Sequence, residues 1–415
     1  MGNSIFAACQ WGMVILIAKL GNAAMVGQFT LGLAITAPIM LLADLKLRDV
    51  QATDARHEYQ FGHYLGLRLL TITAALIIIT LIVWCMGYRS EKAWIILMIA
   101  LAKAFDSLSD ILYGFLQQQE RMNRIAISRI IQGIIQVCAL GLVLILSHSL
   151  LWGTVALAIG SGIVTIAYDI RSVRLIYAMA AAQKTGFTEV VGPLRPRINL
   201  ALLAQLFVLT LPLGLAVMLG SLWINIPRYF IEHFLGEYNL GIFAAMAALL
   251  TVGGTIIGAL GQTVSPRLAK YYAAGNIKAF DNVILRLIVS GFLIGLSGFL
   301  AAMYGGSYLL SLIYRPEYGM YQTVLAWLMA ASILQFTYVF VGTGLQAMRN
   351  FQVHLPIQIG TCIVVFLLSY NLVGPYRLTG AAWAMFGANL FAFVCFLYVF
   401  FHVRQKHSRV IHSRL

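Results

Sequence analysis

Charged residues are scarce in this chain of 415 residues, where Asp, Glu, Lys and Arg together make up 10% of the sequence. Soluble proteins carry about 25% charged and about 45–50% apolar residues, whereas the hydrophobic share here is 61%. The mean hydropathy is +0.87. This balance excludes disordered, collagen-like and ordinary cytosolic proteins, and it predicts a protein embedded in a bilayer.

Cysteine pairs and catalytic motifs are missing as well. The five cysteines all lie inside apolar runs, are odd in number and form no CxxC pair, which argues against a disulfide framework or a zinc site. No GxxxxGKS/T, HExxH or GxSxG motif is present, so the chain lacks the signatures of nucleotide, peptide or ester hydrolysis. We expect no metal, no cofactor and no enzymatic activity.

Long apolar runs fill most of the chain. Because backbone polar groups in lipid must be satisfied internally, continuous runs of this length predict helices rather than the strands of a barrel. The sequence therefore predicts an all-α polytopic membrane protein with about twelve transmembrane helices in two six-helix bundles. The predicted spans are residues 3–20, 27–45, 61–87, 93–116, 125–147, 150–169, 200–224, 238–261, 283–304, 320–346, 352–373 and 378–402.

The longest stretch between spans divides the chain into halves. At the end of each half the same spacing recurs, which favours duplication over chance similarity and is typical of secondary transporters. The recurring residues are Leu151, Gly153 and Gly160, then Leu378, Gly380 and Gly387. The expected domains are an N-terminal bundle (1–170), a cytoplasmic linker (171–199), a C-terminal bundle (200–402) and a basic cytoplasmic tail (403–415).

The net charge of +14 is distributed unevenly between the two sides of the membrane. If the N-terminus is cytoplasmic, twenty of the 28 Lys and Arg residues fall on the cytoplasmic side and six on the other. Cytoplasmic loops carry such an excess, so both termini are expected in the cytoplasm. No basic–aromatic module lies outside the spans, so nucleic acid is not an expected partner.

The fourth predicted span contains a stripe of ionisable residues. At about 100° per residue, Lys103, Asp106 and Asp110 lie within about 60° of one another on one helix face. Such residues are costly in lipid and mark a functional site by default. Lys103 would attract an anionic group, and Asp106 or Asp110 would bind a coupling proton or ion. The alternative is an ion pair that only holds the bundle together.

Three arginines and three prolines complete the candidate residues. Arg48 and Arg68 flank a cytoplasmic loop, where they would hold a lipid phosphate or serve as positive-inside anchors. Arg228 would line the outer mouth of the seventh span or pair with Glu232. Prolines within spans permit bending during alternating access, or serve ordinary packing. They are Pro38, Pro212 and Pro356.

Short motifs along most of the chain resemble those of a known family, the polysaccharide transporter branch of the multidrug/oligosaccharidyl-lipid/polysaccharide exporter superfamily, which includes O-antigen and capsule flippases. Each motif is only moderately specific. They are Ala18-Lys19-Leu20-Gly21, Gly27-Gln28-Phe29, Leu45-Lys46-Leu47-Arg48, Leu108-Ser109-Asp110, Tyr113-Gly114, Gln118-x-Glu120-Arg121-Met122, Asn225-x-Pro227-Arg228-Tyr229, Ser265-Pro266-Arg267-Leu268 and Gly344-Leu345-Gln346-Ala347.

The resemblance implies two six-helix bundles around a cationic cavity, and an ion- or proton-driven cycle. The implied substrate is a polyprenyl-diphosphate-linked oligosaccharide that crosses the bacterial inner membrane for O-antigen, capsule or exopolysaccharide synthesis. Membrane lipid, a polysaccharide polymerase and chain-length machinery are the implied partners. The residues that carry over are Lys103, Asp106, Asp110 and Arg228.

Two other functions stay open at this stage. A multidrug cation/proton antiporter of the same superfamily would need an anionic cavity, so the basic residues Lys103 and Arg228 discriminate against it. A membrane-embedded polysaccharide polymerase would need catalytic residues in a large outer loop, and all predicted outer loops are short.

Overall fold

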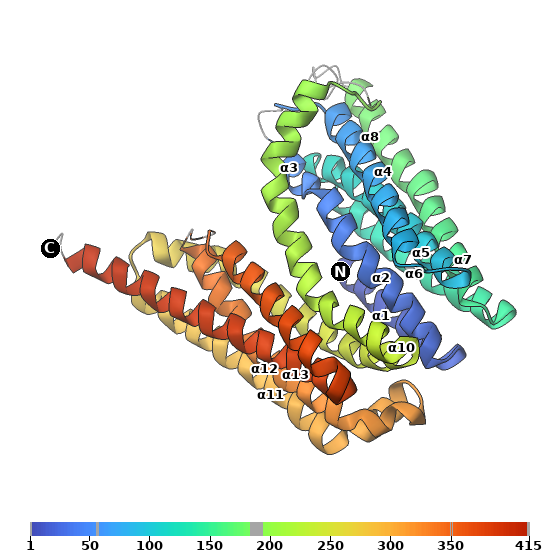
Figure 1. Cartoon of the computed structure of the whole chain (residues 1–415). Helices are drawn as coiled ribbons and strands as arrows, with labels where there is room; N and C mark the ends of the chain where they lie inside the picture. Colours follow the sequence, from blue (N-terminus) through green and yellow to red (C-terminus); the bar gives the residue numbers. More distant parts are fainter. Residues whose placement is uncertain (1, 55–57, 183–193, 349, 351, 413–415) are drawn as a thin grey trace. The chain divides into compact units, whose positions relative to one another are not determined.

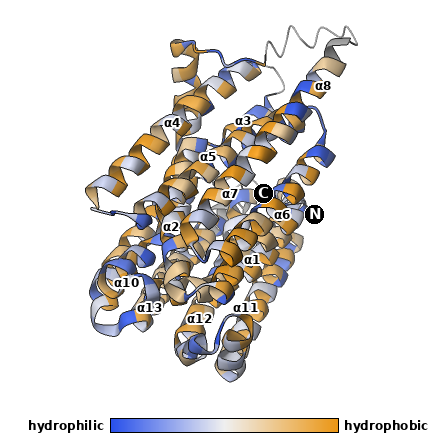
Figure 2. Cartoon of the chain, turned by 90° about the vertical axis from the view of Figure 1, so that its right-hand side faces the viewer, coloured by the Kyte–Doolittle hydropathy of each residue, from blue (hydrophilic) through white to orange (hydrophobic). Residues whose placement is uncertain are grey.

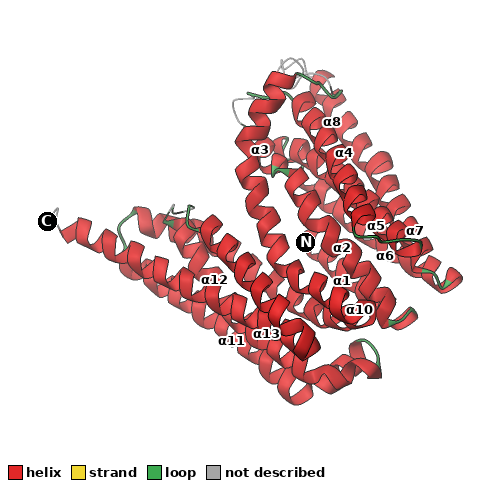
Figure 3. Cartoon of the chain, in the orientation of Figure 1, coloured by secondary structure: helices red, strands yellow, loops and turns green. Residues whose placement is uncertain are grey.

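Helices are the only regular elements among the residues that the computed structural model describes, which are 2–54, 58–182, 194–348, 350 and 352–412 (Figure 3). Within those ranges, nine helical segments are long and apolar enough to cross a membrane. Hydrophobic residues run along the helices, and hydrophilic residues gather mainly at helix ends and in connections (Figure 2). The predicted all-α polytopic membrane protein is confirmed.

Large apolar side chains cover the outside of the helices, as lipid contact requires. Trp84 is 78% exposed and Leu146 is 73% exposed. In water, apolar surface of this extent would drive aggregation, whereas a bilayer solvates it. The polar residues must therefore face inward.

The chain divides into two compact units, Met1–Ser221 and Leu222–Leu415. Of the predicted linker (171–199), residues 183–193 lie outside the described residues. Figure 1 shows the helices of the first unit in blue to green. They are α1 (Gly2–Leu20), α2 (Ala23–Asp44), α3 (Leu47–Thr53), α4 (Phe61–Cys85), α5 (Glu91–Gln118), α6 (Met122–Ser147), α7 (Leu150–Val164), the π-helical turn η1 (Thr165–Ile170), α8 (Arg171–Ala182) and the first part of α10 (Leu200–Ala273).

Helix α5 is the centre of the first unit, because it packs against α2, α3, α4, α6 and α7. This helix carries the charged stripe and, at its start, Glu91 and Lys92. It is not among the nine segments recognised as spans by composition. Surrounding helices shield its charges from lipid, so the most polar long helix of the unit packs against five neighbouring helices.

The short helix α3 was not predicted from the sequence. Leu45 and Lys46 both adopt left-handed conformations, with φ of 50° and 54°. Two successive non-glycine residues in this region are uncommon. They reverse the chain sharply after α2, so that α3 packs against α5 instead of forming an open loop. Arg48 on α3 is thereby placed beside the charged stripe.

The second unit contains the remainder of α10, then α11 (Ile277–Ile313), η2 (Pro316–Tyr321), α12 (Gln322–Ala347) and α13 (His354–His412). Both α10 and α13 are interrupted by a single non-helical residue, Gly236 with φ of 81° and Arg377 with φ of 52°. These interruptions fall between the spans predicted at 200–224 and 238–261, and at 352–373 and 378–402. The number of twelve crossings stays a prediction.

Glycine allows close packing of α11 on α12 within the second unit. A Cβ atom added at Gly295 would lie 2.6 Å from the Cα atom of Ile333. Small residues at such crossings let two backbones approach in a membrane, where apolar burial alone gives no driving force.

The three predicted bending prolines have different environments. Pro38 is buried in the interior of α2. Pro212 is exposed within α10. Pro356 is the third residue of α13. In the first turn of a helix the N–H groups have no helical partner, so a proline there removes no hydrogen bond and does not bend the helix interior. Helix bending in a transport cycle therefore stays a prediction for Pro38 and Pro212.

Candidate functional site

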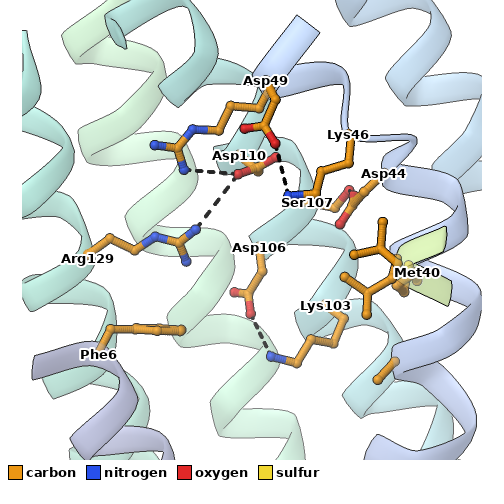
Figure 4. A pocket seen from close by; sticks show the side chains of 14 residues that line it. Phe6, Met40, Asp44, Lys46, Asp49, Lys103, Asp106, Ser107, Asp110 and Arg129 are labelled. Carbon is orange, nitrogen blue, oxygen red and sulfur yellow. Dashed lines mark hydrogen bonds and ion pairs between the residues drawn. The ribbon is translucent and has the colours of Figure 1, made fainter. Parts of the chain in front are cut away.

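A cavity of about 440 Å³ lies within the first unit, beside the charged face of α5 (Figure 4). Residues from α1, α2, α3, α5, α6 and the first part of α10 line it, and eight of them are ionisable. The lining side chains are those of Phe6, Ala37, Met40, Leu41, Asp44, Lys46, Arg48, Asp49, Lys103, Asp106, Ser107, Asp110, Arg129 and Val217.

Asp110 is the carboxylate on which three arginines converge. Arg48 Nη1 lies 3.3 Å from Asp110 Oδ1, and Arg68 Nη2 lies 3.3 Å from Oδ2. Arg129 Nη2 is farther away, at 3.9 Å from Oδ1 (Figure 4). The arginines come from α3, α4 and α6, so one aspartate on α5 joins four helices. Its single negative charge cannot neutralise all three cations.

Arg68 is the most enclosed of the three. Its side chain is fully buried, pairs with both Asp44 and Asp110, and donates to Ser107 Oγ at 3.2 Å. A buried arginine is tolerated only when carboxylates and further hydrogen bonds compensate for its lost hydration. Arg68 thus holds α2, α4 and α5 together, and it lies behind the cavity wall.

Arg48 and Arg129 keep part of their guanidinium groups open to the cavity. Their side chains are 20% and 16% exposed. Both lie over the Tyr113 ring, at 5.6 and 4.9 Å from its centroid, and Arg129 also lies 5.0 Å from the Phe6 ring centroid. Such cation–π contacts orient a cation without neutralising it. The Nε atom of Arg129 is buried without a hydrogen-bond partner.

Lys103 and Asp106 form a second charged group one turn away on α5. Lys103 Nζ donates to Asp106 Oδ2 at 3.0 Å (Figure 4). The other carboxylate oxygen accepts hydrogen bonds from Gln132 at 2.6 Å and Gln136 at 3.2 Å, both on α6. Gln136 also donates to Ser161 Oγ at 2.7 Å. Asp106 is thus held by neutral amides as well as by its lysine.

The cavity as a whole carries a small excess of positive charge. Its lining contributes four basic and four acidic side chains, and Arg68 adds a fifth cation behind the wall. An anion that enters can accept hydrogen bonds from Arg48 and Arg129 and compete with Asp110 for them. Among the described residues, no group of three or more His, Cys, Asp or Glu side chains could hold a metal ion.

A second buried acid lies next to this site, at the π-helical turn η1. Asp169 is fully buried and accepts hydrogen bonds from Ser109 Oγ at 2.6 Å and Ser128 Oγ at 2.5 Å. Tyr113, which packs under both arginines, donates to Asp169 at 3.5 Å. Single π-helical turns within helices often occur at functional sites. The hydroxyl network connects this turn to the Tyr113 ring.

The predicted site residues are placed in three locations. Lys103, Asp106, Asp110 and Arg48 line the cavity, and Arg68 lies behind it. Arg228 belongs to the second unit, where its Nη1 donates to Asn225 Oδ1 at 2.9 Å.

Sequence reasoning missed Arg129 as a site residue, because it was counted among the basic residues of the cytoplasmic side although it lies within the span predicted at 125–147. The structure places Arg129 two turns inside α6, which begins at Met122. A signal was present: Arg129, Gln132 and Gln136 follow the i, i+3, i+7 spacing of one helix face. Asp44, at the end of α2, pairs with Arg68 and lines the cavity.

Comparisons with known proteins support a common family and fold. The sequence model of the family described as "Polysaccharide biosynthesis protein" matches residues 3–272. The "Capsular polysaccharide biosynthesis protein CapF" of Staphylococcus aureus is 27% identical over 401 residues, which is 96% of this chain and 97% of the relative.

Two solved transporter structures share the fold. The lipid II flippase MurJ, in an inward closed conformation, has a TM-score of 0.72 at 11% identity, covering 96% of this chain and 86% of that one. An outward-facing multidrug resistance MATE family transporter of the MOP superfamily has a TM-score of 0.60 at 18% identity, covering 96% and 92%. At such identities these likenesses show the fold alone.

Proposed function

The chain belongs to the polysaccharide biosynthesis protein family, and from this premise we propose that it is a flippase for a polyprenyl-diphosphate-linked oligosaccharide. It moves this lipid across the bacterial inner membrane during surface polysaccharide synthesis. The names of CapF, a capsular polysaccharide biosynthesis protein, and of MurJ, a lipid II flippase, support a lipid-linked glycan as the substrate.

The observation that carries the proposal is the pair of partly exposed arginines in a cavity enclosed by the helices of the first unit. A sugar–diphosphate headgroup cannot cross hydrocarbon unaided, because its charges would lose their hydration. Arg48 and Arg129 replace that hydration by donating to phosphate oxygens, and Lys103 adds a third cation. The polyprenyl tail stays in the lipid.

Asp106 and Asp110 would couple this binding to an ion. A diphosphate that takes over Arg48 and Arg129 leaves Asp110 with Arg68 as its remaining close cation. A carboxylate enclosed by helices that loses two of its three cationic partners takes up a proton or a metal cation more readily. Substrate binding and ion binding are thereby linked through shared arginines, which is the logic of a secondary transporter.

The cavity argues against the two alternatives. A multidrug cation/proton antiporter would have to bind cationic drugs beside Arg48, Lys103 and Arg129. A polysaccharide polymerase would need a catalytic group at the donor sugar, whereas the acids of this cavity are engaged by basic or amide side chains.

A strain that lacks the gene tests the proposal. We expect surface glycan to disappear and lipid-linked oligosaccharide to accumulate in the cell, as measured by blotting and by lipid analysis. The wild-type gene should restore both. Unchanged surface glycan together with lost efflux of cationic dyes would replace the flippase by the multidrug antiporter.

The orientation in the membrane follows from the distribution of basic residues. We propose twelve crossings, with both termini, the linker 171–199 and the tail 403–415 in the cytoplasm. Polymerase and chain-length proteins then act on the product at the opposite face of the membrane. A single cysteine introduced at Ile198 of a cysteine-free variant, a position that is 67% exposed, should react with an impermeant maleimide only after the cells are opened. Labelling of intact cells would reverse the orientation.

A further inference from the structure

The second unit contains a cavity of its own, of about 330 Å³. Its walls are formed by both parts of α10, on either side of Gly236, and by α12 and α13. The volume is at the lower end of the about 300–1,000 Å³ of small-molecule sites. Ordinary helix packing does not require an opening of this size lined by an arginine, and the cavity therefore needs an explanation.

Arg228 is the cation of this cavity, and no carboxylate among the described residues forms an ion pair with it. No acidic residue lines the cavity. Arg228 Nη1 donates a hydrogen bond to Asn225 Oδ1 at 2.9 Å. The Nε atom of Arg228 is buried without a hydrogen-bond partner. In the first unit, by contrast, each arginine of the cavity lies within 4 Å of Asp110.

An arginine without a carboxylate partner inside a bundle of helices is costly, and the cost is recovered when an anion binds. The planar fork of a guanidinium matches a carboxylate, which can accept two parallel hydrogen bonds. A single arginine is a poor match for a diphosphate, whose several charges suit the clustered cations of the first unit. The charge balance thus points to a ligand group with one negative charge.

The other walls of the cavity fit a sugar ring. Trp223 and Phe336 offer apolar faces to the C–H groups of a pyranose. Thr251 and Gln335 carry a hydroxyl and an amide for sugar hydroxyls. A Cβ atom added at Gly254 would meet nothing within 4 Å, so this wall is open. Apolar faces with a few polar groups are the usual composition of small-molecule sites.

We propose that this cavity binds the carboxylate of an acidic sugar, a uronate, in the glycan headgroup, and that Arg228 selects for it. The inference rests on the proposed flippase function. It separates two anion sites by chemistry: clustered cations for the diphosphate in the first unit, and one arginine for the sugar acid in the second unit.

The test uses the full-length protein in liposomes and two synthetic polyprenyl-diphosphate disaccharides that differ only at C6 of the terminal sugar, glucose in one and glucuronate in the other. Initial flipping rates are measured for the wild type, Arg228→Gln, Arg228→Lys and Gly254→Leu. Gly254→Leu fills the cavity without altering the charge. Arg129→Gln, from the first unit, serves as the comparison.

We expect Arg228→Gln to slow the glucuronate lipid about 10- to 100-fold, the range for a charged hydrogen bond, and to leave the glucose lipid unchanged. Arg228→Lys should lose less, and Gly254→Leu should also slow the glucuronate lipid selectively. Arg129→Gln should slow both lipids. Equal losses for both lipids in Arg228→Gln and Gly254→Leu would overturn the uronate site. A wild type that flips neither lipid would instead refute the flippase function.

Discussion

Replacing Asp110 by asparagine is expected to abolish transport and to destabilise the first unit. The substitution keeps the size of the side chain and removes the one negative charge shared by Arg48, Arg68 and Arg129. Removing one partner of a buried ion pair lowers the free energy of unfolding by about 3–5 kcal/mol. Because Asp110 is 24% exposed and Asp44 still pairs with Arg68, we expect the lower end of this range. Thermal unfolding in detergent and surface glycan in a complemented deletion strain measure the two effects.

The double variant Asp110→Asn with Arg48→Gln separates charge balance from function. Removing one cation together with the acid should recover part of the lost stability, because fewer arginines are left without a partner. Transport should stay absent, since both the ion site and a substrate cation are gone. Full stability of Asp110→Asn alone would contradict the role of this carboxylate as the charge that holds three arginines.

Replacing Arg129 by glutamine is expected to reduce flipping strongly while the protein stays folded. Its ion pair with Asp110 is long, at 3.9 Å, and its Nε has no partner, so the folded state loses little. A hydrogen bond from a charged group to phosphate is worth about 1.5–3 kcal/mol, which corresponds to roughly ten- to hundredfold. The initial rate in liposomes and the membrane level of the variant measure the outcome.

Arg124→Gln is the matched control, because it removes an arginine from the same helix. Arg124 does not line the cavity, and its side chain donates to Ser172 Oγ at 3.4 Å. Its loss should leave the flipping rate close to that of the wild type. If both variants slowed flipping equally, the effect would come from net charge on α6, and Arg129 would have no specific role at the substrate.

The sequence predicted the helical membrane fold because composition determines it. Apolar runs of spanning length have no other stable form in lipid. The short helix α3 could not be predicted, since it depends on left-handed conformations at Leu45 and Lys46, neither of which is a glycine. The interruption at Arg377, by contrast, falls between the spans predicted at 352–373 and 378–402.

The candidate site was predicted in part. Helical periodicity brought Lys103, Asp106 and Asp110 to one face, and the structure places all three at one cavity. The convergence of Arg48, Arg68 and Arg129 on Asp110 depends on how four helices pack, which no local pattern encodes. Arg129 was missed because it was counted as a positive charge of the cytoplasmic side, although both the predicted span and α6 contain it.

Flipping by the purified protein in liposomes is the most direct measurement of the proposed function. A polyprenyl-diphosphate oligosaccharide is placed in both leaflets, and an impermeant oxidant that cleaves the sugar is added outside. If the protein is a flippase, about half of the lipid reacts in protein-free liposomes and nearly all of it reacts in liposomes that contain the protein. Equal reaction in both preparations, with protein-dependent movement of a cationic dye instead, would contradict this function.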